Sequence, residues 1–235
     1  GKEKELQQLL QQKQRIANQL NSQIEKLIAE EVARHEREEE ARRLAEAKKQ
    51  AEKTASATKT PETTEKPAKT ESAAPRSGTA PRIDPGAGRS STESFNLSNN
   101  FASNKGKLPM PVTGSSSIVG NFGTKRHSEW NVTTNSNGVD IQAEKGAEIR
   151  SVFDGEVSKV FSFPGSNTCI IVRHGDYYTF YANIYDLFVK QGDKVKAGQS
   201  LGRIFTDPDT GISTMHFQLW QKTNKIDPAP WLNRG

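Results

Sequence analysis

Side chains that could carry acid–base or metal chemistry are scarce in this sequence, which holds four histidines and one cysteine. Cys169 lies in an apolar run over 168–172, a setting that favours a buried structural thiol over a reactive one. His216 follows Thr214 at a spacing of two, and residues two apart on a strand share one face, so both would point into the same site. The other histidines are predicted to lie outside any site: His35 solvated on a charged helix, His127 in a loop, and His174 on the surface or bonded within a hairpin turn.

The elements that must position these residues are unevenly distributed along the 235-residue chain. Every aromatic residue lies at Phe95 or later, and residues 50–94 contain no Leu, Val or Phe. We therefore predict an α + β chain of several parts: a coiled-coil helix over 1–55, a linker over 56–100 and an all-β domain over 101–235.

The predicted helix has no helix-breaking residue between 2 and 53 and is rich in good helix formers. Its Leu and Ile residues recur at helical separations up to Ile28, which places an apolar stripe on one face. A helix of roughly 80 Å with a one-sided stripe is not stable alone. It needs a partner helix, from upstream residues or from another chain.

The predicted linker is rich in Thr, Ala, Pro, Lys and Ser, a composition typical of extended or disordered segments. Near its end, Phe95, Leu97 and Phe101 are the first apolar residues that could dock onto the following domain. The segment thus combines a tether with a docking or regulatory element.

Short alternating strands dominate the sequence from about residue 106 onward. Apolar and polar residues alternate, and glycine-containing turns separate the strands. This spacing predicts a β-sandwich or barrel. The segment KGAEI at 145–149 is echoed by QGDKV at 191–195, which indicates an internal duplication.

The charge pattern excludes some functions. The net charge is +5, but charges of both signs alternate throughout, whereas a nucleic-acid footprint needs clustered basic side chains. No apolar run reaches the roughly 18 residues of a membrane-spanning helix. The chain begins inside the predicted helix, so we expect a fragment from which an export signal or membrane anchor is missing.

Several ordered segments of the β domain resemble the LytM/lysostaphin-type zinc metallopeptidases of bacterial cell walls. They are GNFG at 120–123, NGVDI at 137–141, VFDGEV at 152–157, VRHG at 172–175, YYTFYA at 177–182, VKAGQ at 195–199 and MHFQL at 215–219. The resemblance runs from about 108 to 232 and implies the duplicated hybrid motif fold of that family.

The resemblance fails at the zinc site. Active members hold zinc with the His and Asp of a His-x-x-x-Asp segment and the second His of a His-x-His segment. Two further histidines handle the water and the oxyanion. Here these positions read Ser136, Asp140, Asn183, Thr214 and His216. Two remaining ligands, Asp140 and His216, do not hold zinc tightly, and Asn183 and Thr214 cannot carry protons near neutral pH. We therefore predict no metal, no cofactor and no catalytic residue.

A degenerate domain behind a long helix resembles the murein hydrolase activators. That resemblance implies a non-catalytic regulator of cell-wall remodelling and daughter-cell separation, in the periplasm or envelope of a Gram-negative bacterium. The partner would be an N-acetylmuramoyl-L-alanine amidase or another peptidoglycan hydrolase. The coiled coil would bind a membrane division complex, and peptidoglycan would be a further partner. The predicted partner-binding groove consists of Ser136, Asn137, Asp140, Tyr181, Asn183, Thr214 and His216.

Two other functions stay open. An atypical zinc endopeptidase would use Asp140 and His216, with His127 as a substitute ligand and peptidoglycan cross-bridges as substrate. A passive wall-binding module would use exposed aromatic rings, for which the candidates are Trp130, Tyr177, Tyr178 and Trp220, although Trp220 and one of the tyrosines are expected in the core.

If part of 1–101 covers the groove, the full chain should activate more weakly than 104–235 alone.

Overall fold

The computed structural model of the protein describes residues 1–56 and 89–235, with side chains of 89–93 left out. Of the linker predicted over 56–100, residues 57–88 lie outside the described residues. Within the described ranges, no helix is both long and apolar enough to cross a membrane. The elements are α1 (Lys2–Ser56), α2 (Arg89–Ser103), β1 (Ser116–Gly120), β2 (Gly123–His127), β3 (Val132–Ser136), β4 (Val139–Ala143), β5 (Glu148–Arg150), β6 (Gly155–Phe163), β7 (Asn167–His174), β8 (Tyr177–Leu187), β9 (Lys194–Val195), β10 (Ser200–Ile204), β11 (Ser213–Gln221), β12 (Asn224–Ile226) and a 3-10 turn at Ala229–Trp231.

The strands form one large antiparallel sheet and a separate hairpin. The main path runs β1-β4-β11-β8-β7-β6-β9, with β10 pairing to β5 and β8 and with β12 pairing to β11; β2 and β3 form the hairpin. Strand β8 changes partner near Asn183, because its first half pairs with β11 and β7 and its end pairs with β10. The sequence predicted an all-β sandwich or barrel, and its β-rich character is confirmed by this mainly antiparallel sheet.

The two faces of β8 bury different cores. Tyr178 and Phe180 belong to the cluster on one face, and Tyr177 and Tyr181 belong to the larger cluster on the other. This is the period-two alternation of a strand that is covered on both sides. The larger cluster fills the body of the domain, whereas the smaller one needs a cover from elsewhere in the chain.

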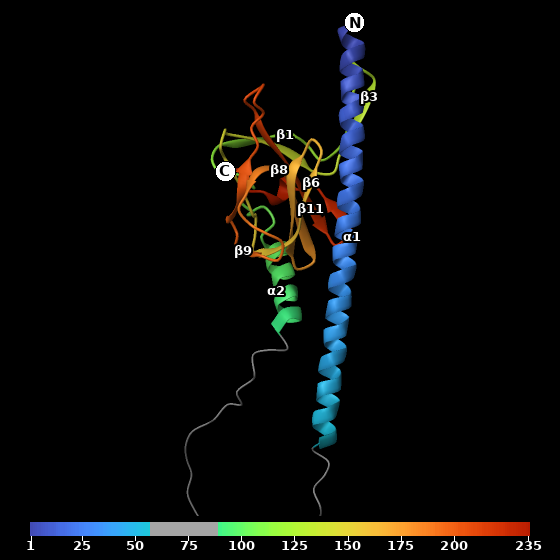
Figure 1. Ribbon diagram of the computed structural model, residues 1–235, viewed down its shortest axis with the longest axis vertical. Coiled ribbons are helices and arrows are strands. Elements are labelled where there is room, and N and C mark those ends of the chain that lie inside the picture. The colour runs from blue at the N-terminus through green and yellow to red at the C-terminus, as the bar shows by residue number, and fades with distance from the viewer. Residues whose placement is uncertain (57–88) are drawn as a thin grey trace, which may run out of the picture.

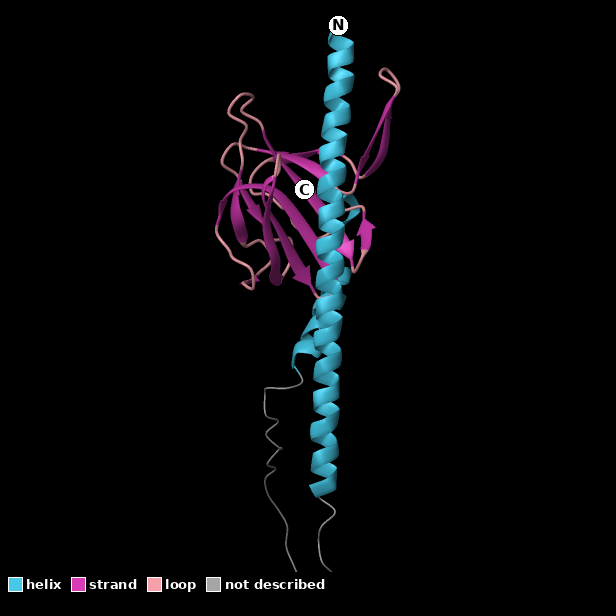
Figure 2. Cartoon of the chain, turned by 45° about the vertical axis from the view of Figure 1, so that its right-hand side comes forward, coloured by secondary structure: helices cyan, strands magenta, loops and turns pink. Residues whose placement is uncertain are grey.

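Helix α1 provides that cover. It is a single helix of 55 residues that crosses the sheet, as Figures 1 and 2 show. Leu20, Ile24 and Ile28, at successive spacings of four, are buried against Cys169, Ile171, Tyr178, Phe180 and Trp220. The predicted helix is confirmed, and its described partner is the sheet. The coiled coil remains a prediction, for which the exposed Leu6, Leu9 and Ile16 are available.

Helix α2 begins at residue 89, inside the predicted linker, in the part where a docking or regulatory segment was expected. Its Phe101 is fully buried and stacks on Tyr177 at 4.6 Å and on His174 at 5.0 Å between ring centroids. Gly175 lies so close to the helix that a Cβ there would be 2.1 Å from Ser98 Oγ. The docking expected of Phe101 is therefore observed, whereas Phe95 is 66% exposed.

Candidate functional site

Strands β4 and β11 bring the two retained ligand positions together. Their antiparallel register sets His216 directly opposite Asp140, and Nδ1 of His216 lies 2.8 Å from Oδ1 of Asp140. Directly opposed residues on one face of an antiparallel pair are close enough for such contact. The side chains are 21% and 45% exposed, so the pair lies at a partly open surface.

Gln218 fixes the hydrogen bonding of His216. Its Oε1 accepts a hydrogen bond from the buried Trp220 Nε1 at 3.0 Å, which orients the amide group. Its Nε2 then donates to Asn21 Oδ1 of α1 at 3.1 Å and lies 3.1 Å from Nε2 of His216. His216 Nε2 thus accepts from Gln218, and its protonated Nδ1 donates to Asp140.

Sequence reasoning missed Gln218 and Asn21 as members of this site. A signal for Gln218 existed, because it continues the alternation of Thr214 and His216 on the same face of β11. No local signal marked Asn21, which is almost two hundred positions from Gln218 in the chain.

Ser136 and Asn137 close the β3–β4 end of the site. Ser136 Oγ donates to the backbone oxygen of Gly138 at 3.0 Å, and Asn137 is buried. The neighbouring Asn135 exchanges two hydrogen bonds with the side-chain amide of Gln14 on α1, at 3.1 and 3.2 Å. Helix α1 therefore contacts both the serine side and the histidine side of the predicted groove.

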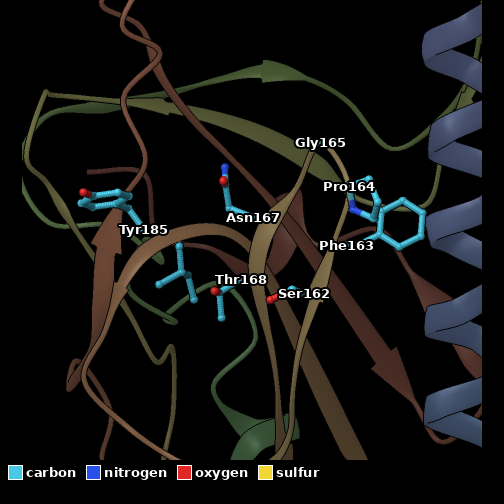
Figure 3. Close-up of a pocket in the computed structure, with 8 residues that line it drawn as sticks. Ser162, Phe163, Pro164, Gly165, Asn167, Thr168 and Tyr185 are labelled. Atoms are coloured by element: carbon cyan, nitrogen blue, oxygen red, sulfur yellow. The ribbon is translucent and has the colours of Figure 1, made fainter.

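Asn183 belongs to a local polar network. Its Nδ2 donates to the backbone oxygen of Thr214, and its Oδ1 accepts from Nδ2 of Asn167. The backbone of Asn183 has φ of 71°, a left-handed conformation that Asn tolerates better than most residues. Beyond it, a pocket of about 490 Å³ opens between the β6–β7 hairpin and Tyr185, and Figure 3 shows Phe163 on the side that faces α1.

Tyr181 does not line the groove, and this prediction is corrected. The residue is fully buried in the larger core, on the face of β8 opposite to Phe180. Its hydroxyl accepts a hydrogen bond from the backbone nitrogen of Val152 at 3.1 Å and one from Thr179 Oγ1 at 3.0 Å. Strand alternation places it there, since Phe180 takes the face shared with His216.

The other histidines differ from expectation in their surroundings. His35 is only 14% exposed rather than solvated, with Nε2 at 2.9 Å from Arg173 NH1. His127 ends β2 instead of lying in a loop and bonds Thr134 Oγ1 at 3.0 Å. His174 is fully buried rather than at the surface, bonding Asp154 O at 2.6 Å, and burial lowers its pKa to about 4.

The buried thiol expected at Cys169 is confirmed. Cys169 is fully buried beneath α1, and this burial raises its pKa to about 12. Among the aromatic candidates for wall binding, Tyr177, Tyr178 and Trp220 are buried, and Trp130 is half-buried and stacked on His127 at 5.9 Å.

A buried carboxylate anchors α1 to the sheet beside the site. Glu31 is 2% exposed, bonds Ser158 Oγ and Arg34, and lies 3.5 Å from Lys159. Burial acts to raise the pKa of Glu31, but the hydrogen bonds from Arg34 and Ser158 and the two nearby positive charges outweigh it and lower the pKa. The ionised form is therefore the one that fits this interface.

The residues present do not fit a zinc ion. Only Asp140 and His216 offer suitable donors, and both available nitrogens of His216 are engaged by Asp140 and Gln218. The hydroxyl of Ser136 is bonded to Gly138. In the described ranges, 1–56 and 89–235, no three His, Cys, Asp or Glu side chains are grouped so that they could hold a metal ion.

Fold and site together describe an antiparallel β domain in which the paired Asp140 and His216 occupy two of the three ligand positions expected of a zinc peptidase. Residues 134–228 match the model of Peptidase family M23, and the chain contains a peptidase M23 domain of the LytM type. The resemblance predicted from the sequence is thereby confirmed.

Curated relatives agree with this assignment. The chain is 26% identical over 98 residues to "Murein hydrolase activator EnvC" of Escherichia coli, a match that covers 41% of this chain and 23% of EnvC. It is 33% identical over 97 residues to "Uncharacterized lipoprotein YgeR" of Escherichia coli, covering 40% of this chain and 38% of YgeR. It is 33% identical over 99 residues to "Murein hydrolase activator NlpD" of Escherichia coli, covering 40% and 25%. The matches span a quarter to two-fifths of these relatives.

Proposed function

We propose that this protein is a non-catalytic activator of peptidoglycan hydrolases. The observation that carries the proposal is the retained scaffold with an altered site, in which His216 is bonded to Asp140 and Gln218 while Ser136, Asn183 and Thr214 replace the family histidines. Two relatives that share its M23 domain are named murein hydrolase activators, which supports the same role. Its amidase partner would bind the vestigial groove.

The position of α1 gives this activator a closed state. Asn21 and Gln14 contact the two sides of the groove, and Ile24 and Ile28 bury the apolar face beside it. A partner that grips the groove must compete with α1. The full chain should therefore activate more weakly when α1 is held in place, which develops the expectation that part of 1–101 covers the site.

The test is to lock and release α1. Glu25 and Lys225 form an exposed ion pair at 2.8 Å across this interface, so both can be replaced by cysteine in a Cys169→Ala background. A short bismaleimide then joins the pair. The unlocked chain should stimulate a cell-wall amidase of the same organism, and the cross-linked chain should not. Each single-cysteine chain, treated identically, is the control.

Two outcomes separate the parts of the proposal. If neither form stimulates any amidase, the activator role is overturned. If both stimulate equally, the activator role stands and the closed state is rejected. Removing 1–103 is a weaker test, because it also deletes Phe101 from the core.

The proposed location is the periplasm or cell envelope of a Gram-negative bacterium, in line with relatives from Escherichia coli that include a lipoprotein. The exposed Leu6, Leu9 and Ile16 at the start of α1 would pair with a helix of a membrane division complex. Peptidoglycan itself is a further proposed partner, and nucleic acid is not.

A zinc endopeptidase with an atypical site is the second candidate, supported by the adjacent Asp140 and His216. Metal analysis decides it: stoichiometric zinc in the purified chain together with muropeptide release from sacculi would favour the enzyme. Passive wall binding depends on Trp130, because the other candidate rings are buried. Co-sedimentation with sacculi that is lost in Trp130→Ala would favour that third role.

A further inference from the structure

A second cleft lies away from the vestigial site, where α1, α2 and the β6–β9 edge of the domain meet. Its volume is about 450 Å³. Residues of α1 form one wall, β6, β7, β9 and neighbouring residues form the other, and Ser94 and Leu97 of α2 contribute the end. Ligand-sized pockets are commonly found where separate parts of a chain meet.

Charge in this cleft is unbalanced. The three carboxylates of its lining already have cationic partners: Glu38 pairs with Arg34 at 3.0 Å, Glu156 with Arg173 at 3.7 Å and Asp154 with Lys196 at 3.7 Å. Arg34 also pairs with Glu31, which Lys159 faces as well, so the four carboxylates are matched by four cations and any further cation in the cleft is in excess.

Arg42 and Lys194 are those further cations. Arg42 reaches the cleft from α1 and Lys194 from β9, on opposite walls, and neither has an ion pair with the side chains of residues 1–56 or 94–235. The Nε atom of Arg42 is buried and is the one side-chain polar atom of the described residues that is buried without a hydrogen-bond partner. A buried donor without an acceptor is costly, and the cleft that Arg42 lines is where an acceptor for its guanidinium group can enter.

We propose that this cleft binds a small phosphate ester, with the phosphate between Arg42 and Lys194. A phosphate group carries nearly two negative charges and three strong acceptor oxygens, which suits a guanidinium and an ammonium on opposite walls. The cleft is larger than a bare phosphate requires, and Leu97 and Val195 offer apolar surface to the organic part of the ester.

The ligand would join two parts of the protein. Arg42 belongs to α1 and Lys194 to the β domain, so the bound phosphate bridges the helix and the domain that it covers. Binding should therefore hold α1 more tightly against the sheet. This inference is independent of the activator proposal, because it concerns binding and helix docking and requires no hydrolase.

The experiment is calorimetric titration of the full chain with glycerol 3-phosphate and, separately, with inorganic phosphate at low ionic strength. The wild-type chain should bind the ester more tightly than phosphate alone. Arg42→Gln and Lys194→Gln should each weaken binding by about tenfold, the loss of one charge-assisted contact. Lys145→Gln, which removes an equal charge outside the cleft, should bind like the wild type.

A second readout is labelling of Cys169, which is buried beneath α1 and is the single cysteine of the chain. The ester should slow its reaction with a thiol reagent in the wild type and have no effect in Arg42→Gln. Vesicles of phosphatidylglycerol form a further arm: binding that is lost in the same two variants would identify a lipid headgroup as the source of the phosphate. Absence of any binding, or equal binding by all four chains, would overturn the proposal.

Discussion

Gln218 and Asn21 form a hydrogen bond that links the long helix to His216 and Asp140 of the vestigial site, with Gln218 Nε2 at 3.1 Å from Asn21 Oδ1. The same nitrogen donates to His216, which in turn donates to Asp140. Docking of α1 and the state of His216 are thus coupled through one side chain. This coupling makes the helix–site interface the part of the molecule where substitutions are most informative.

Replacing Asn21 with alanine should loosen α1 without disturbing the sheet. The substitution removes the acceptor for one proton of Gln218 and should cost about 1 kcal/mol of docking free energy. The population with α1 released then rises about fivefold, and labelling of Cys169 accelerates by the same factor. Ser22→Ala, an exposed neighbour on the same helix, is the control and should leave the rate unchanged.

The apolar anchor should matter more than this hydrogen bond. Ile24 is fully buried against the cluster that contains Trp220 and Phe180, and Ile24→Ala should cost about 2–4 kcal/mol of docking free energy. Labelling of Cys169 should accelerate strongly while the melting of the β domain changes little. Leu44→Ala, at a position 59% exposed, should have no effect. Comparable rates in the two variants would mean that α1 does not protect the thiol.

Docking of α1 onto the sheet should require Glu31 in its ionised form. Glu31→Gln keeps the shape but loses the charge that Arg34 and Lys159 face, so docking should weaken by about 1–3 kcal/mol. Since the pKa of Glu31 is lowered in the docked state, the same contribution is lost in the wild type as the pH falls below about 4.5. Amide hydrogen exchange along α1 measures both effects. Glu30→Gln, one exposed residue earlier, is the matched control.

His35 should give the docking of α1 a second dependence on pH. Burial lowers its pKa first, and the charge of Arg173 lowers it further, against smaller opposing effects of Glu39, Asp176 and Glu38. When α1 is released, His35 is solvated and its pKa returns to about 6.5. Below about pH 6.5 the released helix binds more protons at His35 than the docked helix does. The docking free energy of α1 is therefore at its full value above about pH 6.5 and decreases as the pH falls toward the lowered pKa.

Hydrogen exchange along α1 at a series of pH values tests this dependence on His35. The wild type should lose protection between neutral and mildly acidic pH, and His35→Gln should lose none in that window. An unchanged pH profile in the variant would assign the effect to another group, and Glu31 is separated by its lower window.

Features with a local pattern were predictable from the sequence. The α1 helix followed from its composition, and the alternating strands and glycine turns indicated the antiparallel domain. The pairing of Asp140 with His216 agrees with the positions inferred for a family site. In each case the residues that specify the feature are neighbours in sequence or belong to an ordered series of motifs.

Features that depend on packing between distant segments were not predictable. His35 was expected in solvent because the sequence of α1 contains no pattern that predicts its contact with Arg173 of the sheet. His174 was expected at the surface or bonded within a hairpin turn, but Phe101 of α2 stacks on it and its Nδ1 bonds Asp154 O outside that turn. Tyr181 was assigned to the groove because the motif contains it, although strand alternation turns its side chain into the core.

Restoring the family's histidines provides the final prediction. Ser136→His should give Asp140 and His216 a third ligand, so this single variant should bind zinc, provided that His216 exchanges its bond to Gln218 for the metal. It should not hydrolyse peptidoglycan, because Asn183 and Thr214 cannot replace an imidazole in accepting and donating a proton near neutral pH. Asn183→His or Thr214→His alone should neither bind zinc nor hydrolyse.

The triple variant should bind zinc and show slow hydrolysis. Position 183 can accept the change, because histidine tolerates the left-handed conformation there better than most residues. Zinc content by elemental analysis and muropeptide release from sacculi measure the two properties separately. Hydrolysis by any single variant would contradict the view that all three positions, 136, 183 and 214, disable the site. The wild-type chain would then have to be regarded as a weakened enzyme.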